Sequence, residues 1–115
     1  MTKKIKRVLI IDDEEDTCQL IKAYLERSQI EVAYANEFRR GIEKIEDFEP
    51  ELIFLDNYLP DATSVCELPQ LKKRFPDITI VMISATAHLQ EKALTAGADG
   101  FIEKPLSFKA VKAFL

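Results

Sequence analysis

The hydrophobic residues of this 115-residue chain gather into short continuous runs that are separated by longer amphipathic segments. Three of the runs are almost purely aliphatic, which is typical of strands that are buried on both faces of a sheet. Two weaker runs include polar residues and fit better at the edges of a sheet. The three apolar runs cover residues 8–11, 52–55 and 78–83, and the two weaker runs cover 30–35 and 100–104.

Apolar residues recur at helical spacing between these runs, so each intervening segment can place them on one face. The predicted helices cover residues 14–28, 37–48, the region from Val65 to Phe75, and 89–96. Pro69 falls inside the third of these and should kink that helix or delay its start. Asn36 and Ser107 are candidate N-caps, and Gly97 is a candidate helix stop.

The alternation of strands and helices predicts an α/β fold with a doubly wound, five-stranded parallel sheet and right-handed crossovers. If the three apolar strands are central, the simplest order is 2-1-3-4-5, with strands numbered along the chain. The order reverses between strands 1 and 3, and ligands bind beyond the carboxyl ends of the strands at such a point. The length fits one domain over residues 1–115. We expect its fifth helix to be cut short at the C-terminus.

Composition narrows the range of functions. The chain is 47% hydrophobic and 31% charged, with a net charge of -4. The negative net charge argues against binding to the phosphate backbone of nucleic acid. The sequence contains neither a signal peptide nor a membrane span, so we expect a cytoplasmic protein. Cys18 and Cys66 lack metal-binding spacing and are expected to be buried small residues. His88 is expected to be exposed.

Polar residues follow four of the predicted strands: Asp12 and Asp13, then Asp56, Ser84 and Lys104. Two carboxylates about 4 Å apart repel by roughly 4 kcal/mol at an effective dielectric near 20, so they need a cation. Magnesium binds a few carboxylates and shares phosphate oxygens. The pattern therefore predicts a phosphoryl-transfer site. Asp12 and Asp13 would hold Mg²⁺, Asp56 would be the nucleophile, and Lys104 and Ser84 would hold the phosphoryl oxygens.

Taken singly, these residues have ordinary explanations. Acids are favoured at a helix N-terminus, which accounts for the acidic run after Asp13 but not for the burial of Asp12. Asp56 alone could be a turn residue, and Lys104 alone could be a solvated residue on an edge strand. Only their joint placement at strand ends makes the site prediction specific.

The same residues give the chain a resemblance to the receiver domains of two-component response regulators, along essentially its whole length. The matching segments are Asp12-Asp13 after an apolar strand, Asp56 in LIFLDNYLP, Ser84-Ala85 after ITIVMI, and Lys104-Pro105 in GADGFIEKP. The resemblance implies a flavodoxin-like fold and a phosphorylation-dependent signalling switch. It also implies that Asp56 accepts its phosphoryl group from a sensor histidine kinase or a histidine phosphotransfer protein.

The resemblance further implies how the site works. Mg²⁺ would be bound by Asp13, Asp56 and the backbone carbonyl of Tyr58, with Asp12 acting partly through water. Ser84 would turn toward the phosphoryl group while Phe101 moves inward, and the bond before Pro105 could be cis.

The resemblance implies partners as well. The kinase would dock against the first helix and the loop after the fifth strand, and a downstream output domain or protein would receive the signal. A dimer through the face of the fourth helix and fifth strand is allowed. By this interpretation the domain binds neither nucleic acid nor membrane, and it is not an enzyme beyond its own phosphoryl transfer and dephosphorylation.

The chain departs from the family pattern after Asp56. Leu59 replaces the usual methionine, which is a mild change. Ser64 stands where a glycine is usual, so a turn that prefers positive φ must hold a serine or take another shape.

Two other classes of protein fit the sequence less well. A hydrolase of the haloacid-dehalogenase type would carry a second aspartate where this chain has Tyr58. The only glycines are Gly41, Gly97 and Gly100, so neither a G-x-G-x-x-G motif nor a P-loop follows the first strand, which excludes a nucleotide-binding fold of that kind. The alternative that stays open is a degenerate receiver, which binds partners without being phosphorylated.

Overall fold

The computed structural model describes residues 4–115 and contains a five-stranded parallel sheet. Its order is β2-β1-β3-β6-β7, which confirms the predicted order 2-1-3-4-5. The strands are β1 Arg7–Ile11, β2 Glu31–Ala35, β3 Leu52–Asp56, β6 Thr79–Ser84 and β7 Gly100–Glu103. A small antiparallel hairpin of β4 Tyr58–Leu59 and β5 Ala62–Thr63 was not predicted, because two-residue strands show no periodicity.

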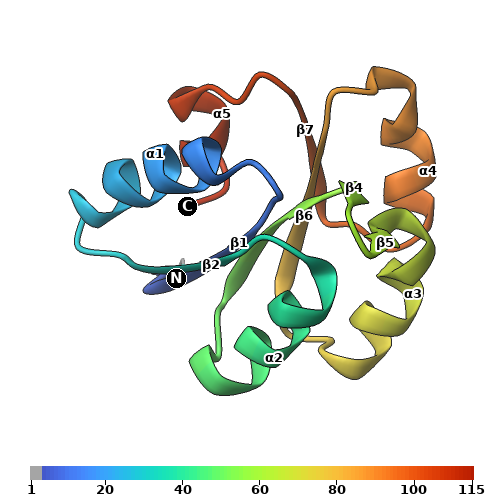
Figure 1. Cartoon of the computed structure of the whole chain (residues 1–115), viewed down its shortest axis with the longest axis horizontal. Helices are drawn as coiled ribbons and strands as arrows, with labels where there is room; N and C mark the ends of the chain where they lie inside the picture. The colour runs from blue at the N-terminus through green and yellow to red at the C-terminus, as the bar shows by residue number, and fades with distance from the viewer. Residues whose placement is uncertain (1–3) are drawn as a thin grey trace.

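Helices cover both faces of the sheet (Figure 1). One layer holds α1 and α5, and the other holds α2, α3 and α4. The helices are α1 Glu15–Glu26, α2 Phe38–Phe48, α3 Ser64–Arg74, α4 Gln90–Thr95, which follows the 3₁₀ turn η1 Ala87–Leu89, and α5 Phe108–Lys112. The first four match the predicted helix ranges to within a few residues, as expected of helix boundaries, and α5 follows the N-cap predicted at Ser107. The truncation of the fifth helix stays a prediction.

Successive residues of the central strands feed two separate cores. In β1, Leu9 and Ile11 pack with α2, α3 and α4, whereas Val8 and Ile10 pack with α1 and α5. All four side chains are fully buried. This two-sided burial explains why the strand sequence is continuously apolar, since each such side chain contributes about 1.5–3 kcal/mol when removed from water.

The start of α2 differs from the prediction. Asn36 is not its N-cap, because its side-chain amide instead donates to the backbone carbonyl of Asp12 (2.9 Å). The first helical N–H groups, those of Phe38 and Arg39, donate to the carboxylate of Asp61 at 2.8 and 2.9 Å. A carboxylate supplies two acceptors and a negative charge at the positive end of the helix, so the cap comes from a distant loop.

Two other helix signals are confirmed. Ser107 caps α5, because its hydroxyl accepts a hydrogen bond from the N–H of Ala110 at 3.0 Å. Gly97 follows the end of α4 with a φ of +115°, a conformation that glycine adopts without strain.

The third helix rules out one of the two effects predicted for Pro69 and corrects the prediction for Cys66. It begins at Ser64, so Pro69 lies inside it and does not delay its start. Cys66 is exposed rather than buried, because Val65, Leu68 and Leu71 form the buried face and Cys66 lies off that face. Cys18, by contrast, is buried as expected.

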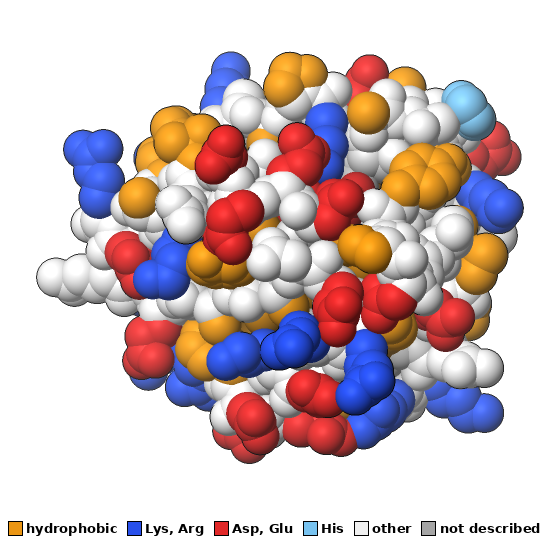
Figure 2. All heavy atoms as spheres, viewed as in Figure 1, with side chains coloured by type: hydrophobic (Ala, Val, Ile, Leu, Met, Phe, Trp, Pro, Cys, Tyr) orange, Lys and Arg blue, Asp and Glu red, His pale blue; other side chains and the backbone are white. Residues whose placement is uncertain are grey.

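The surface carries both signs of charge. Figure 2 shows acidic and basic side chains interspersed on one face of the molecule, with hydrophobic side chains between them. His88 is exposed, as expected. Within residues 4–115, every helix is too short or too polar to cross a lipid bilayer.

Candidate functional site

The polar residues that follow the strands meet at the carboxyl edge of the sheet. Lys104, just after β7, places its Nζ 3.0 Å from Asp12 Oδ2 and 3.3 Å from Asp56 Oδ2. The backbone N–H of Lys104 donates to the carbonyl of Ser84 (2.9 Å), which ties the ends of β6 and β7 together. Asp12, Asp56 and Ser84 are buried. The structure therefore brings the predicted residues of four strands into one polar edge.

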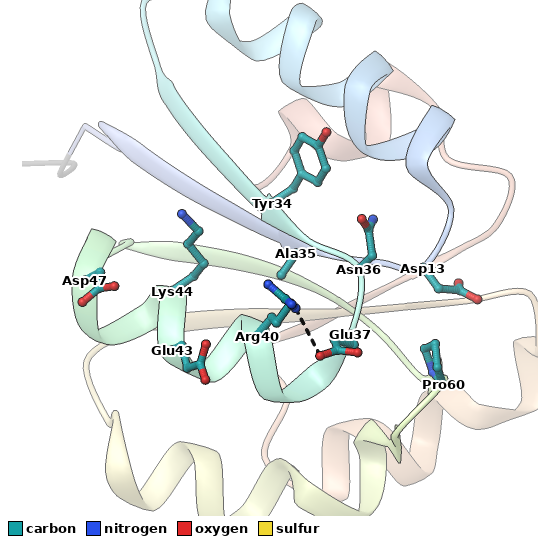
Figure 3. Close-up of a pocket in the computed structure, with 10 residues that line it drawn as sticks. All are labelled: Asp13, Tyr34, Ala35, Asn36, Glu37, Arg40, Glu43, Lys44, Asp47 and Pro60. Carbon is teal, nitrogen blue, oxygen red and sulfur yellow. Dashed lines mark ion pairs between the residues drawn. The ribbon is translucent and has the colours of Figure 1, made fainter.

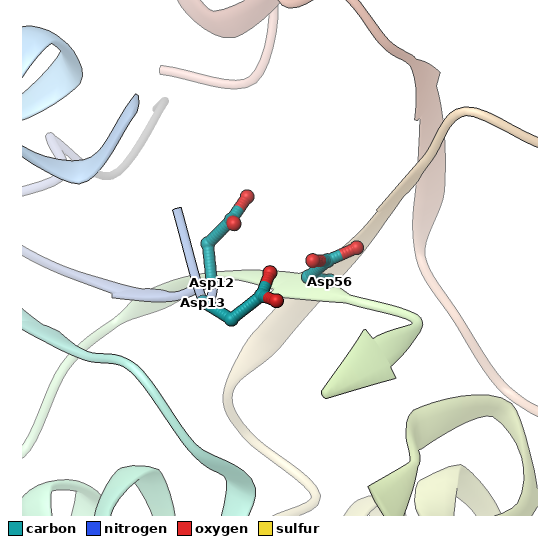
Figure 4. Close-up of side chains that lie close together, drawn as sticks. All are labelled: Asp12, Asp13 and Asp56. Carbon is teal, nitrogen blue, oxygen red and sulfur yellow. The ribbon is translucent and has the colours of Figure 1, made fainter. Parts of the chain in front are cut away.

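Three carboxylates form an acidic cluster at this edge (Figure 4). One oxygen each of Asp12, Asp13 and Asp56 lie within 4.8 Å of one another. Asp13 is exposed, so the cluster is open to water on one side. Hard oxygen donors with access for water are the donor set that Mg²⁺ prefers, so these residues fit a divalent cation.

Burial and mutual repulsion disfavour the ionised forms of the buried carboxylates in the cluster. Burial raises the pKa of Asp12. Burial and the neighbouring charge of Asp12 together raise the pKa of Asp56 to about 7. Burial opposes the charge of Lys104, but hydrogen bonds to Glu14 and Asp12 outweigh it and raise the pKa of its ammonium group. The site therefore stabilises the charged form of Lys104 and disfavours the charged forms of Asp12 and Asp56.

Asp12 is fixed by its surroundings. Its Oδ1 accepts the backbone N–H of Glu14 at 2.8 Å. Its backbone carbonyl accepts the amide of Asn36 at 2.9 Å and the thiol of Cys18 at 3.4 Å. Burial raises the pKa of Cys18 to about 12, so the thiol keeps the proton that it donates. Cys18 is thus a buried support of the site.

Glu14 is a site residue that sequence reasoning missed. Its Oε1 lies 2.7 Å from Lys104 Nζ, the shortest of the three carboxylate contacts of that ammonium group. In the sequence, the acids after Asp13 are explained by the helix N-terminus alone. The signal that could have revealed Glu14 is the lysine at the end of the fifth strand, which needs more than one acceptor.

Comparisons with known proteins agree with this geometry. Residues 8–115 match the family model described as the response regulator receiver domain. The chain belongs to this family. One relative is the alkaline phosphatase synthesis transcriptional regulatory protein PhoP of Bacillus subtilis, 38% identical over 94% of this chain and 46% of that protein. The chemotaxis protein CheY of Halobacterium salinarum is 30% identical over 92% of this chain and 90% of that protein.

A solved structure supports the fold of the receiver domain. The crystal structure of a two-component response regulator from Clostridium difficile superimposes with a TM-score of 0.87 at 28% identity, covering 95% of this chain and 91% of that one. The present chain spans about half the length of the PhoP protein that it resembles.

The loop after Asp56 takes another shape than a glycine turn. Ser64 is the first residue of α3, and its φ is not positive. The residues with positive φ in the described part of the chain are Gln29, Glu49 and Gly97. Its buried hydroxyl donates to the backbone carbonyl of Asp56 at 2.5 Å. Where the family pattern has a glycine, this receiver domain therefore has a serine that forms a hydrogen bond to the backbone of Asp56.

The remaining predicted site residues lie around this loop and the neighbouring edge. The side chain of Tyr58 is 54% exposed, and Phe101 is half-buried against the core that α4 helps to form. The hydroxyl of Ser84 accepts the N–H of Thr86 at 3.1 Å, which leaves its own proton available. The Lys104–Pro105 peptide bond is cis.

A groove of about 660 Å³ leads to the acidic cluster of the receiver domain from the side of β2 and α2. Figure 3 shows that Asp13, Asn36, Glu37, Arg40 and Pro60 are among its lining residues. Arg40 forms an ion pair with Glu37 at 3.4 Å. The groove reaches the acidic cluster at Asp13, whose side chain is exposed.

Proposed function

We propose that this receiver domain is a phosphorylation-dependent signalling switch in which Asp56 accepts a phosphoryl group from a histidine of a partner protein. The observation that carries the proposal is the place of Asp56. It is buried at the end of β3, its carboxylate is 3.3 Å from Lys104 Nζ, and it belongs to the acidic cluster. A carboxylate between a cation and a metal-binding cluster is suited to phosphoryl transfer, which depends on positioning and charge.

The transfer balances as a simple displacement. A carboxylate oxygen of Asp56 attacks phosphorus, the P–N bond to the donor histidine breaks, and the imidazole nitrogen keeps the electron pair and takes up a proton. Lys104 and Ser84 bind the phosphoryl oxygens. The domain acts on no other substrate in this scheme, so we propose that it is not an enzyme beyond its own phosphoryl transfer and dephosphorylation.

Mg²⁺ is the proposed cofactor. Asp13, Asp56 and the backbone carbonyl of Tyr58 would hold it, with Asp12 acting partly through water. When bound, the ion supplies positive charge against the phosphoryl oxygens. The mutual distances of the three carboxylates support this assignment.

The switch follows from the energetics of the new contacts. Lys104 and Ser84 each gain a charge-assisted hydrogen bond worth roughly 1.5–3 kcal/mol, or about 3–6 kcal/mol in sum. Reversing a two-state equilibrium from about 1:99 to 99:1 takes about 5.5 kcal/mol, so both contacts are needed. Pro105 directly follows Lys104, and Phe101 lies on β7 opposite Met82, two residues before Ser84, so these two residues would carry the change toward α4 and β7.

Two surfaces would serve the partners. A groove of about 450 Å³ beside the site lies between α1 and the loop after β7, with Leu20, Lys104 and Phe108 among its lining residues. Leu20 and Phe108 are 60% and 40% exposed, which suits a docking surface for a histidine kinase or phosphotransfer protein. The face of α4 and β7 would contact an output domain or protein, or a second copy of the chain.

Intact-mass spectrometry tests the proposal. The protein is incubated with acetyl phosphate or phosphoramidate, with Mg²⁺ or with a chelator, and Asp56→Asn serves as the control. We expect one phosphoryl adduct on the wild-type chain with Mg²⁺ and none on the variant. Absence of the adduct in every condition would leave the degenerate receiver as the better account, and turnover of a free phosphate ester would indicate a hydrolase.

A further inference from the structure

Ser64 lies at the junction between the end of β3 and the start of α3. It is fully buried, its hydroxyl donates to the carbonyl of Asp56 at 2.5 Å, and its N–H donates to the carbonyl of Asn57 at 2.7 Å. The side-chain oxygen of Asn57 accepts the N–H of Val65 at 3.0 Å. Asn57 is itself tied to β6, because its N–H donates to the carbonyl of Ile83 at 3.1 Å.

These hydrogen bonds join the two ends of the loop between β3 and α3. The loop contains the β4–β5 hairpin, in which Tyr58 pairs with Thr63 and Leu59 pairs with Ala62. Tyr58 follows the Asp56–Asn57 segment directly, and Thr63 directly precedes Ser64. The Ser64 hydroxyl adds a side-chain hydrogen bond to the backbone and Asn57 hydrogen bonds that join the two ends of the segment, and it is the one that holds the Asp56 carbonyl, two residues before Tyr58.

The loop conformation depends on the Ser64 hydroxyl because the Asp56 carbonyl to which it donates belongs to a buried residue. Without the Ser64 hydroxyl, the Asp56 carbonyl loses the donor that satisfies it, and the peptide after Asp56 loses a restraint. A metal ion that uses a backbone carbonyl of this loop must then order the loop when it binds, so its affinity falls. Groups that orient metal ligands typically change metal affinity by roughly 10- to 100-fold when removed.

We propose that Ser64 is a positioning residue for the divalent cation, holding the peptide that follows Asp56 and hence the Tyr58 carbonyl in the geometry that the metal needs. The proposal rests on the proposed function, since it assumes Mg²⁺ at the acidic cluster. In this chain the hydroxyl does by hydrogen bonding what a glycine turn does in the family pattern. Restoring glycine at this position is therefore a loss for this chain.

The test measures Mg²⁺ affinity by isothermal titration calorimetry on the wild-type chain, Ser64→Ala and Ser64→Gly. Ser107→Ala is the matched control, because it also removes a serine hydroxyl that makes one backbone hydrogen bond, at the start of α5. Backbone NMR spectra recorded during the titration report which amides sense the metal. Both Ser→Ala variants lose some stability, so stability alone does not separate them.

We expect both Ser64 variants to bind Mg²⁺ at least about tenfold more weakly than the wild-type chain, with smaller Mg²⁺-induced shifts at Tyr58. Ser107→Ala should stay within about twofold of the wild-type affinity. Equal Mg²⁺ affinity in the wild-type chain and in whichever Ser64 variant folds would overturn the role of Ser64 while leaving the proposed function intact. A wild-type chain that takes up no Mg²⁺ would instead refute the metal part of the proposed function, and with it this inference.

Discussion

The two sides of Asp56 are held by different kinds of interaction. On the side of β7, Lys104 is bound by the carboxylates of Asp12, Glu14 and Asp56 at 2.7–3.3 Å. On the side of α3, the backbone of Asp56 is bound by the neutral hydroxyl of Ser64. We call these the charged flank and the hydrogen-bonded flank.

The two flanks differ in how readily their interactions can be replaced. Ion pairs in the charged flank can be exchanged for a metal ion or a phosphoryl group, because those ligands carry the same kinds of charge. The hydrogen bonds of the other flank join backbone groups that no ligand replaces. We therefore infer that the charged flank changes during switching and that the hydrogen-bonded flank keeps its geometry.

The largest expected effect is a pH dependence of the charged flank. The pKa of Asp56 is raised from 3.8 to about 7 by burial and by the charge of Asp12. A carboxyl group with a raised folded-state pKa contributes stability that is fully present below pH 4 and is lost as pH rises through about 7. At about 1.4 kcal/mol per pKa unit, a shift of this size corresponds to a loss on the order of a few kcal/mol.

Urea unfolding in a chelating buffer between pH 4 and pH 8 measures this loss. The wild-type chain should lose stability as pH rises, whereas Asp56→Asn should show a much flatter profile. Identical profiles for the two chains would show that Asp56 is not held unfavourably.

Lys104→Ala is expected to destabilise the metal-free fold by about 3 kcal/mol. The variant leaves the fully buried Asp12 without its cation, and breaking a buried ion pair by removing one partner is strongly unfavourable. Lys22→Ala is the control, because Lys22 pairs with Glu26 on the surface of α1 and such pairs contribute less than about 1 kcal/mol. Similar losses for both variants in urea unfolding would contradict the importance of the charged flank.

Asp13→Asn separates the metal from the fold. A cation present at about 100 times its dissociation constant stabilises the folded chain by about 2.7 kcal/mol. The variant should lose this gain, and its metal-free form should be somewhat more stable than the wild type because one carboxylate repulsion is gone. Thermal unfolding with and without Mg²⁺ measures both effects, and a full Mg²⁺ response in the variant would argue against Asp13 as a ligand.

The smallest effect concerns the loop of the hydrogen-bonded flank. Asp61→Ala removes the carboxylate that caps α2 and should cost about 1 kcal/mol. Burial slightly opposes its charge, but hydrogen bonds from the N–H groups of Arg39 and Phe38 lower the pKa of Asp61, so its contribution is present above about pH 4 and fades as pH falls further. Urea unfolding against the exposed Asp77→Ala checks this, and equal losses at pH 7 would count against the cap.

The sheet order and the acidic cluster could be predicted from sequence because both follow from the strands. Continuously apolar runs identify strands that are buried on both faces, and residues at their carboxyl ends must lie at one edge. Asp12, Asp56 and Lys104 were therefore expected together, and the structure places them in contact.

Contacts between distant loops could not be predicted in the same way. Asp61 caps a helix that begins 23 residues earlier in the chain, so the local pattern favoured Asn36 instead. Lys104 and Glu14 are 90 residues apart, and only the closed fold shows that they meet. The prediction that Cys66 is buried was wrong because the register of α3, and not the residue type, decides which side of the helix is buried.

The central claim is that Asp56 receives the phosphoryl group, and the most direct measurement locates it on the chain. The phosphorylated protein is reduced with borohydride, which converts an aspartyl phosphate to homoserine, and is then digested and sequenced by tandem mass spectrometry. The account predicts homoserine at position 56 alone, formed only with Mg²⁺. Homoserine at Asp12 or Asp13, or an unmodified Asp56 in a chain that carries the phosphoryl adduct, would contradict it.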